Sequence, residues 1–397
     1  MKQNPSVADR HIPKVNFDQA SELILIADVS KRPLIIRGRP GGGKTEATRS
    51  YVRAQRAAIM GDPERLKKVI DAIPAGSPLL KRPIEEQVFG YIDFRLTYFD
   101  PTDLKGFPIL DKEIGVSRWL PPGTLPLQKL VDAGIIPARG LWGLEELANA
   151  TRATLAATFQ AVLDREVAGE PIAEGWCIVA TSNSIEDMSV VNPLPAPLVS
   201  RFSHCELNIS TGEWCDWAMR FGVNDKLVSY FKFKPESLFG FNSKNWIQDT
   251  PYCCPRSVEM LSDAMAAWDA VGRGRYPLHL ITSFIGATVG NEFYAYLDIF
   301  KDLPSVAEVI ADPMGAKLPK ETSAIYAICT ALARKADREN LDSLYVYFSR
   351  FEKAFEIAAV KDVNRCHPAL ASHPAFGKHV LKPENSEIYT ELASGNN

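Results

Sequence analysis

The stretch Gly38-Arg39-Pro40-Gly41-Gly42-Gly43-Lys44-Thr45 decides the fold of this 397-residue chain. It matches the pattern G-x-x-x-x-G-K-[ST], in which a turn without bulky side chains lets backbone N–H groups surround phosphate oxygens. Lys44 is expected to reach the β- and γ-phosphates, and the Thr45 hydroxyl is expected to ligate Mg²⁺. The stretch therefore predicts that the chain binds ATP together with Mg²⁺.

The residues on either side supply the context that such a loop requires. An apolar run rich in β-formers, residues 33–37, leads into the glycines, and residues 45–59 contain mostly good helix formers. This order predicts a strand, then the loop, then a helix whose positive N-terminal end points at the phosphates.

Further strands and helices alternate along the first half of the chain. Apolar spacing predicts helices at 18–28 and 151–165. The candidate strands, including the one before the loop, are residues 33–37, 91–99, 139–144, 176–181 and 204–209. Such alternation predicts an α/β fold of the P-loop NTPase type, with a parallel five-stranded sheet flanked by helices and ligands bound at the carboxyl ends of its strands.

The pattern becomes helical from Thr211 onward. Candidate helices are residues 214–218, 226–233, 257–271, 278–300, 321–335 and 341–360, with no convincing strand between them. We therefore predict an ATPase core over 1–210, an all-α lid with extra C-terminal helices over 211–380, and a flexible polar tail over 381–397.

Composition limits the remaining possibilities. The seven cysteines lack paired C-x-x-C spacing, which is typical of reduced thiols. No apolar stretch approaches the roughly 20 residues of a membrane span, and the N-terminus lacks a signal-peptide core, so we expect a cytoplasmic protein without a membrane partner. The net charge of −3 gives no basic field, so a nucleic-acid partner is not indicated.

Two adjacent carboxylates end the candidate strand at 139–144. Hydrolysis of ATP requires one carboxylate that supports Mg²⁺ and one that polarises the attacking water. Glu145 fits the metal position and Glu146 the water position. The alternative is that this pair is merely favourable charge at the N-terminus of a helix.

Several motifs then follow one another in an order that resembles the AAA+ ATPases, specifically the MoxR type and its phage and prophage relatives. They cover roughly residues 30–265 and are collectively specific. Besides the glycine loop, these motifs are Phe99–Pro108, Pro121–Gly123, the region with the two carboxylates that ends in Asn149-Ala150, Phe159–Arg165, the strand end Thr181–Asn183, Pro195–Phe202 and Pro255–Ser257.

The resemblance implies roles for three residues. Asn183 would be the first sensor of the γ-phosphate or attacking water, and Arg201 the arginine finger that enters the neighbouring subunit's site. Arg256 would approach the phosphates from the lid of its own subunit. Without the resemblance, Asn183 could cap a turn and both arginines could be ordinary surface residues. A finger supplied by another subunit implies an oligomer, and the family form implies a homo-hexameric ring.

The sequence departs from the family pattern at the carboxylate pair Glu145-Glu146 and in the strand before it. The family normally has Asp where this chain has Glu145, and Gly143 is unusual within a strand. Both features suggest an attenuated ATPase. The family also implies an insertion that faces the ring pore, here residues 105–123, with Phe107 and Trp119 as candidate contacts; core packing is the default expectation for both aromatics.

Three functions follow from these features. The first is a chaperone-like ring ATPase that remodels or activates a partner protein, in some relatives a separate chain with a von Willebrand factor A domain. The second is a nucleic-acid motor or loader. The third is a nucleotide-gated scaffold with weak hydrolysis. A phage-encoded protein would work in the host cytoplasm.

Overall fold

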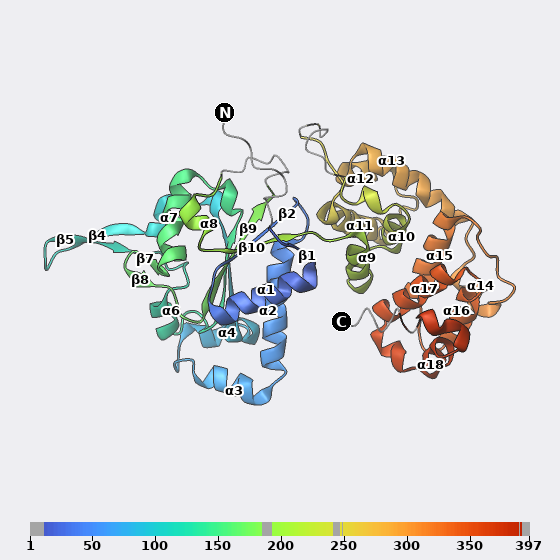
Figure 1. Ribbon diagram of the computed structural model, residues 1–397, viewed down its shortest axis with the longest axis horizontal. Helices are drawn as coiled ribbons and strands as arrows, with labels where there is room; N and C mark the ends of the chain where they lie inside the picture. The colour runs from blue at the N-terminus through green and yellow to red at the C-terminus, as the bar shows by residue number, and fades with distance from the viewer. Residues whose placement is uncertain (1–11, 185–192, 241–246, 248, 389, 391–397) are drawn as a thin grey trace. The chain divides into compact units, whose positions relative to one another are not determined.

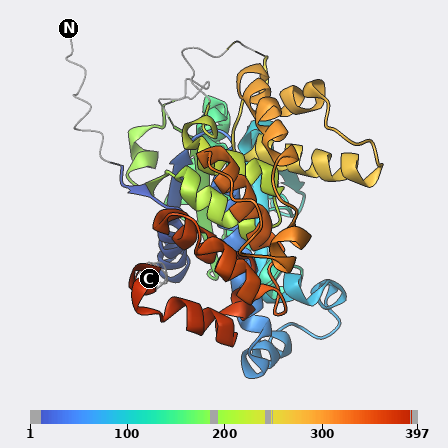
Figure 2. The ribbon, with the colours of Figure 1, turned by 90° about the vertical axis from the view of Figure 1, so that its right-hand side faces the viewer.

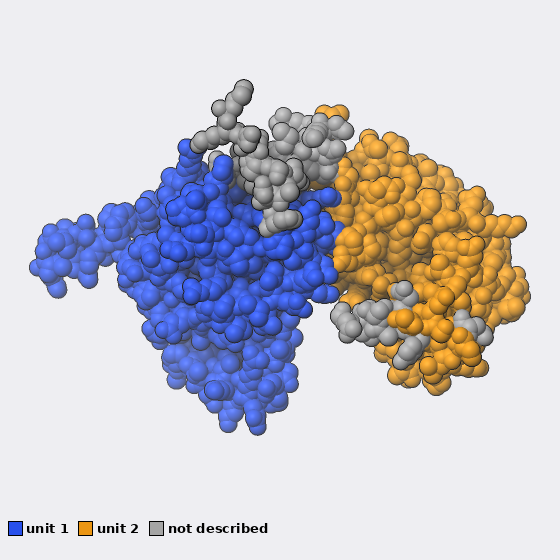
Figure 3. Space-filling model, viewed as in Figure 1, with its two compact units in different colours: residues 1–209 blue, residues 210–397 orange. Residues whose placement is uncertain are grey.

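The computed structural model describes residues 12–184, 193–240, 247, 249–388 and 390 (Figure 1). The chain divides into two compact units, Met1–Ile209 and Ser210–Asn397, which Figure 3 shows in different colours. Unit 1 contains the sheet, and unit 2 is helical in its described part. No helix among the described residues is long and apolar enough to span a bilayer.

The central sheet of unit 1 is parallel throughout and has six strands in the order β1-β10-β2-β9-β6-β3. The strands are β1 (Lys14–Val15), β2 (Leu34–Gly38), β3 (Gly90–Arg95), β6 (Gly140–Glu145), β9 (Trp176–Asn183) and β10 (Ser203–Leu207). The α/β prediction is confirmed, but the predicted count of five is wrong because β1 adds a sixth strand at one edge. A two-residue strand has no apolar period that the sequence could reveal.

Helices cover both faces of this sheet, as the alternating strand residues require. Leu34 and Ile36 of β2 point to one side and pack with α1 (Phe17–Ser30) and α2 (Lys44–Met60). Ile35 points to the other side and joins a core that includes α7 (Arg152–Leu163). Both faces are therefore buried, and the carboxyl ends of the strands remain as the edge at which a ligand can bind.

The register sets which residues meet at that edge. Gly38 at the end of β2 pairs with Asn183 at the end of β9. On the other side of β9, Leu144 pairs with Ala180, so Glu145 and Thr181 follow on adjacent strands. The glycine loop thus begins beside Asn183, with the carboxylate of Glu145 one strand farther along.

Two predicted strands end earlier than expected. The candidate at 91–99 stops at Arg95, and Leu96–Tyr98 forms a 3₁₀ turn. The candidate at 204–209 is shifted to Ser203–Leu207. After β3 the apolar pattern continues past the last ladder pair because Leu96 is also buried, and after β10 it continues through the half-buried Ile209.

An antiparallel hairpin projects from the body of unit 1 (Figure 1). Its strands are β4 (Phe107–Asp111) and β5 (Val116–Leu120), which pair only with each other. Phe107 is 63% exposed and Trp119 is 49% exposed, so the expectation of core packing is wrong for both. The hairpin extends away from the sheet, and its short strands give these rings no layer against which to pack.

Unit 2 is helical throughout its described part (Figures 1 and 2). Its α-helices are α9 (Thr211–Arg220), α10 (Asp225–Phe233), α11 (Pro255–Ala270), α12 (Leu278–Ile285), α13 (Ala287–Tyr296), α14 (Val306–Ala311), α15 (Thr322–Arg334), α16 (Leu341–Phe348), α17 (Lys353–Cys366) and α18 (Pro374–Val380).

Two of the predicted helices of unit 2 are each divided. The candidate at 278–300 breaks at Gly286, whose φ of 78° lies in the left-handed region. A Cβ there would lie 2.5 Å from the carbonyl oxygen of Pro251, so the break depends on glycine. The candidate at 341–360 breaks between Phe348 and Lys353, and the second helix then continues to Cys366.

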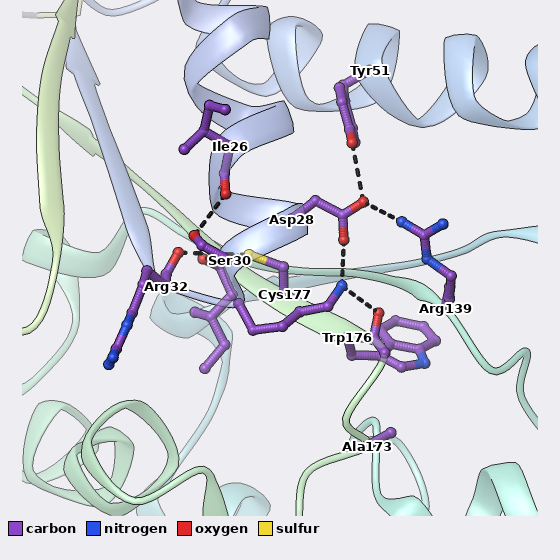
Figure 4. A network of polar contacts seen from close by, with 12 residues as sticks. Ile26, Asp28, Ser30, Arg32, Tyr51, Arg139, Ala173, Trp176 and Cys177 are labelled. Carbon is purple, nitrogen blue, oxygen red and sulfur yellow. Dashed lines mark hydrogen bonds and ion pairs between the residues drawn. The ribbon is translucent and has the colours of Figure 1, made fainter.

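A buried carboxylate organises the opposite end of the strands, the amino-terminal end, near the start of β9. Asp28 on α1 is fully buried and accepts hydrogen bonds from the Tyr51 hydroxyl at 3.0 Å and the Arg139 guanidinium at 2.9 Å (Figure 4). Lys31 donates to its other oxygen at 2.6 Å and to the carbonyl of Gly175 at 3.0 Å. This network ties α1 and α2 to the loops that lead into β6 and β9, and it lies outside the carboxyl-end site.

Candidate nucleotide-binding site

The glycine loop has a backbone that only glycine accommodates at several positions. Gly41 and Gly43 have φ angles of 70° and 89°, in the left-handed region. A Cβ on Gly38 would lie 2.9 Å from the carbonyl oxygen of Leu207, and one on Gly42 would lie 3.1 Å from that of Arg39. The turn from Gly38 through Arg39 and Pro40 to Gly43 therefore leaves an open concave backbone surface in which side chains would interfere.

The helix that follows presents its N-terminus to this surface. Gly43 is the N-cap of α2, and no side chain accepts a hydrogen bond from the first turn. Because the first N–H groups of a helix lack partners within the helix, they and the helix dipole favour an anion at this point. The backbone of the loop and helix thus favours an anion at this point.

Lys44 lies within the concave surface. Its Nζ donates to the carbonyl oxygens of Gly38 at 2.8 Å and Arg39 at 2.9 Å, and to Asn183 Oδ1 at 3.0 Å. The structure thus brings Lys44 and Asn183 into direct contact, although they are 139 positions apart in the chain. A cation and an amide side chain that lie together beside open backbone N–H groups are suited to phosphate oxygens.

Glu145 is the carboxylate nearest to the loop. It is 2% exposed, and its Oε2 accepts a 2.8 Å hydrogen bond from the Thr45 hydroxyl. The Thr181 hydroxyl donates to the same oxygen, and the Tyr91 hydroxyl lies 3.3 Å from Oε1. The two residues predicted as metal ligands, Thr45 and Glu145, are therefore adjacent, and their hard oxygen donors are those that Mg²⁺ prefers.

Sequence reasoning missed Tyr91 and Thr181, which hold Glu145. Burial, and then the neighbouring charge of Glu145, raise the pKa of Tyr91 far above its ordinary value, so its hydroxyl stays protonated and can donate. Knowledge that β3 pairs with β6 would have suggested Tyr91 as a partner on this strand. Asp93 is opposite Gly143, and Tyr91 therefore lies diagonally across from Gly143.

Gly143 has a structural explanation in the same contact. A Cβ at this position would lie 3.1 Å from the Tyr91 hydroxyl and 3.2 Å from a carbon of its ring. The absence of a side chain on β6 therefore lets the Tyr91 ring cross the strand toward Glu145. Glycine weakens a strand, and here it provides space for an aromatic ring.

Glu146 occupies an unusual backbone conformation directly after β6. Its φ of 58° and ψ of 37° are left-handed, which costs a non-glycine residue on the order of 1–3 kcal/mol and is enriched at functional sites. Its N–H donates to the Thr181 hydroxyl at 3.3 Å. In the part of the chain that the structure describes, its half-buried carboxylate makes no hydrogen bond or ion pair, so it is available to bind water.

The two predicted arginines are not gathered at this site within one unit. Arg201 follows the short helix α8 (Ala196–Val199) in unit 1; it is exposed and makes no side-chain hydrogen bond or ion pair with any described residue. Arg256 is exposed near the start of α11 in unit 2. Both positions leave the guanidinium groups accessible to another molecule.

No family model matches the chain, and no curated protein matches it either. Solved structures do resemble it. The Holliday junction branch migration motor RuvB of Thermotoga maritima has 12% identity and a TM-score of 0.33, and the match covers 98% of this chain and 97% of RuvB.

NtrX from Brucella abortus, in complex with ATP, has 14% identity and a TM-score of 0.33, with 97% of this chain and 69% of that one covered. At these identities and TM-scores the neighbours do not identify the chain's activity. The functional assignment therefore depends on the residues of the site itself.

Proposed function

We propose that the chain binds and hydrolyses ATP with Mg²⁺ as cofactor. One observation carries the proposal: Lys44, Thr45, Asn183 and Glu145 converge from three elements on a loop whose glycines leave its backbone open. Core packing does not explain this combination. A buried carboxylate costs free energy unless it is paired with a charge, and the described partners of Glu145 are only hydroxyl groups.

The residues present fit such a nucleotide and metal. The backbone N–H groups and Lys44 would hold the phosphates, and Thr45 and Glu145 would hold Mg²⁺, which supplies charge neutralisation when it is bound. Thr181 and Tyr91 orient the Glu145 carboxylate. Glu146 would accept a proton from, and orient, the attacking water, while Asn183 would donate its amide to the γ-phosphate or to that water.

The direct test is nucleotide binding by the Lys44→Ala variant. Loss of a charge-assisted contact to phosphate of about 2.7 kcal/mol predicts roughly 100-fold weaker ADP binding in calorimetry. Lys68→Ala is the matched control, because Lys68 is an exposed lysine of the same unit on α3 (Pro63–Asp71). Equal affinity of the Lys44→Ala variant and the parent protein would refute the proposal.

We further propose that the chain is a ring ATPase of the AAA+ class and the MoxR type, assembled as a homo-hexamer. The exposed Arg201 supports this, because it could complete the site of a neighbouring copy as an arginine finger, with Arg256 acting from the lid. A mixing experiment tests it. Lys44→Ala and Arg201→Ala proteins should each be inactive, and an equal mixture should recover activity at about a quarter of its interfaces, those with both residues intact.

Failure of the mixture to recover activity, when both variants are folded and oligomeric, would show that Arg201 does not act across an interface. Sedimentation velocity of the parent protein with ATP gives the number of subunits. A species smaller than a hexamer under saturating ATP would contradict the proposed ring.

The proposed work of the ring is to remodel or activate a partner protein in the cytoplasm. The hairpin β4-β5 supports a protein substrate, because isolated hairpins are only marginally stable and this one exposes Phe107, Leu110 and Trp119. A partner with a von Willebrand factor A domain is one candidate. A Glu146→Gln variant, which should retain ATP, would capture the substrate, and Phe107→Ser in the same background should release it. Recovery of nucleic acid alone would favour a motor or loader instead.

A further inference from the structure

A second pocket lies in unit 1, separate from the glycine loop. It has a volume of about 370 Å³ and lies between α2, the edge strand β3 and the segment that leads into α4 (Ile84–Val88). This volume is within the roughly 300–1,000 Å³ that is usual for small-molecule sites. None of the residues discussed as phosphate or metal ligands lines it.

Arginines dominate the charge of this pocket. Arg49, Arg53 and Arg56 recur on one face of α2, and Arg82 faces them from the segment before α4. Glu86 is the acidic residue among the lining. The pocket therefore carries more positive than negative side chains, although the whole chain has a net charge of −3.

Part of that positive charge has no local counter-ion. Arg49 pairs with Asp93 at 2.8 Å, and Arg53 pairs with Glu46. Arg56 donates from Nε to the carbonyl oxygen of Phe89 at 2.9 Å and forms no ion pair with any described residue. For Arg82 the described residues provide no side-chain hydrogen bond or ion pair at all.

The floor of the pocket is apolar and rigid. Trp176 is 1% exposed, and its indole N–H donates to the carbonyl oxygen of Pro137 at 2.9 Å, which fixes the ring. Gly90 lies against that ring so closely that a Cβ would be 2.5 Å from it. Tyr91, Ile92 and Ile136 lie over this rigid base, are partly exposed, and form the accessible part of the floor. An inorganic anion would leave the floor uncovered, and an uncharged apolar ligand would leave Arg56 and Arg82 without counter-charge.

We propose that this pocket binds a small organic anion, with two or more negative charges on an apolar or aromatic body. The charges would pair with Arg56 and Arg82, and the body would cover the partly exposed Ile92 and Ile136. Such a ligand can also affect the nucleotide site, because Tyr91 lines the pocket and its hydroxyl lies 3.3 Å from Glu145 Oε1. The binding does not depend on ATPase activity, but the effect on the nucleotide site rests on the function proposed above.

The test uses naphthalene-1,5-disulfonate as the probe, a rigid aromatic dianion, titrated calorimetrically into the full-length Lys44→Ala protein. This background removes the lysine of the glycine loop as a competing anion site. Arg82→Gln should weaken binding about fivefold to tenfold, and addition of Arg56→Gln should weaken it by a similar further factor. Arg82 is exposed, so its substitution does not threaten folding; circular dichroism verifies the double variant.

A charge-matched control separates a built site from general attraction. Lys67→Gln with Lys68→Gln removes two exposed positive charges from α3 in the same unit and should change the probe affinity less than twofold. No measurable binding to the Lys44→Ala protein, or equal weakening by the arginine and lysine pairs, would overturn the proposal whether or not the chain proves to be an ATPase.

The link to the nucleotide site has its own readout in the protein with Lys44 intact. Bound probe should change ADP affinity, ADP should change probe affinity by the same factor, and Tyr91→Phe should abolish this coupling while retaining the probe. Independent binding of the two ligands to the parent protein would refute the link and leave the pocket assignment standing.

Discussion

Replacement of Thr181 by valine removes one hydroxyl that organises Glu145 and keeps the shape of the side chain. Thr181 is 2% exposed; its hydroxyl donates to Glu145 Oε2 and accepts from the N–H of Glu146 at 3.3 Å. A hydrogen bond to a charged group contributes about 1.5–3 kcal/mol, and the variant leaves a buried carboxylate short of one donor. We therefore expect local destabilisation of about 2 kcal/mol and a loss of the Mg²⁺-dependent part of ATP affinity.

Thr181→Ser is the matched control, because it keeps the hydroxyl and removes one buried methyl group, which costs about 0.8 kcal/mol. Hydrogen exchange of the β6 and β9 amides, followed by mass spectrometry, measures the opening free energy of this part of unit 1 by itself. Calorimetry of ATP with and without Mg²⁺ measures the functional effect. If valine proves no more harmful than serine in both measurements, Thr181 does not position Glu145.

Three further predictions follow from contacts in unit 1. Asp28→Asn should destabilise unit 1 by about 3 kcal/mol. This is the low end for breaking a buried ion pair, because Arg139 and Lys31 are partly exposed. Amide hydrogen exchange on α1 would measure the destabilisation. Glu145→Asp should weaken the 2.8 Å contact with Thr45 because the side chain is one methylene shorter; a strong rise in ATPase rate would instead show that the native site is attenuated and favour the scaffold function. Burial raises the pKa of the Cys205 thiol from 9.0 to about 11, so the unfolded chain loses this proton first and stability should fall as the pH rises from 9 toward 11. In pH-dependent urea unfolding, Cys205→Ala should make this fall smaller, with the other buried thiols and tyrosines accounting for the remainder.

The sequence determined those parts of this protein whose signal is local. Glycines with a following lysine and threonine predicted the loop at 38–45, because its backbone conformation requires glycine and because phosphate and Mg²⁺ call for a cation and a hydroxyl at the start of the helix. Apolar runs predicted β2, β6 and β9, because strands buried on both faces are continuously apolar. The change to helical periodicity at Thr211 predicted the helical second half, because a helix buried on one face repeats apolar residues every three or four positions.

Tertiary structure alone decided the features that depend on register and on packing between distant residues. Tyr91 reaches Glu145 because β3 lies beside β6 and Gly143 leaves room for the ring, a relation over 54 positions that no local pattern encodes. The sixth strand, the exposure of the hairpin aromatics and the arginine pocket arise likewise from which elements become neighbours. Local propensity selects helices and strands, whereas the burial of side chains from remote segments fixes their contacts, and only those contacts create a site.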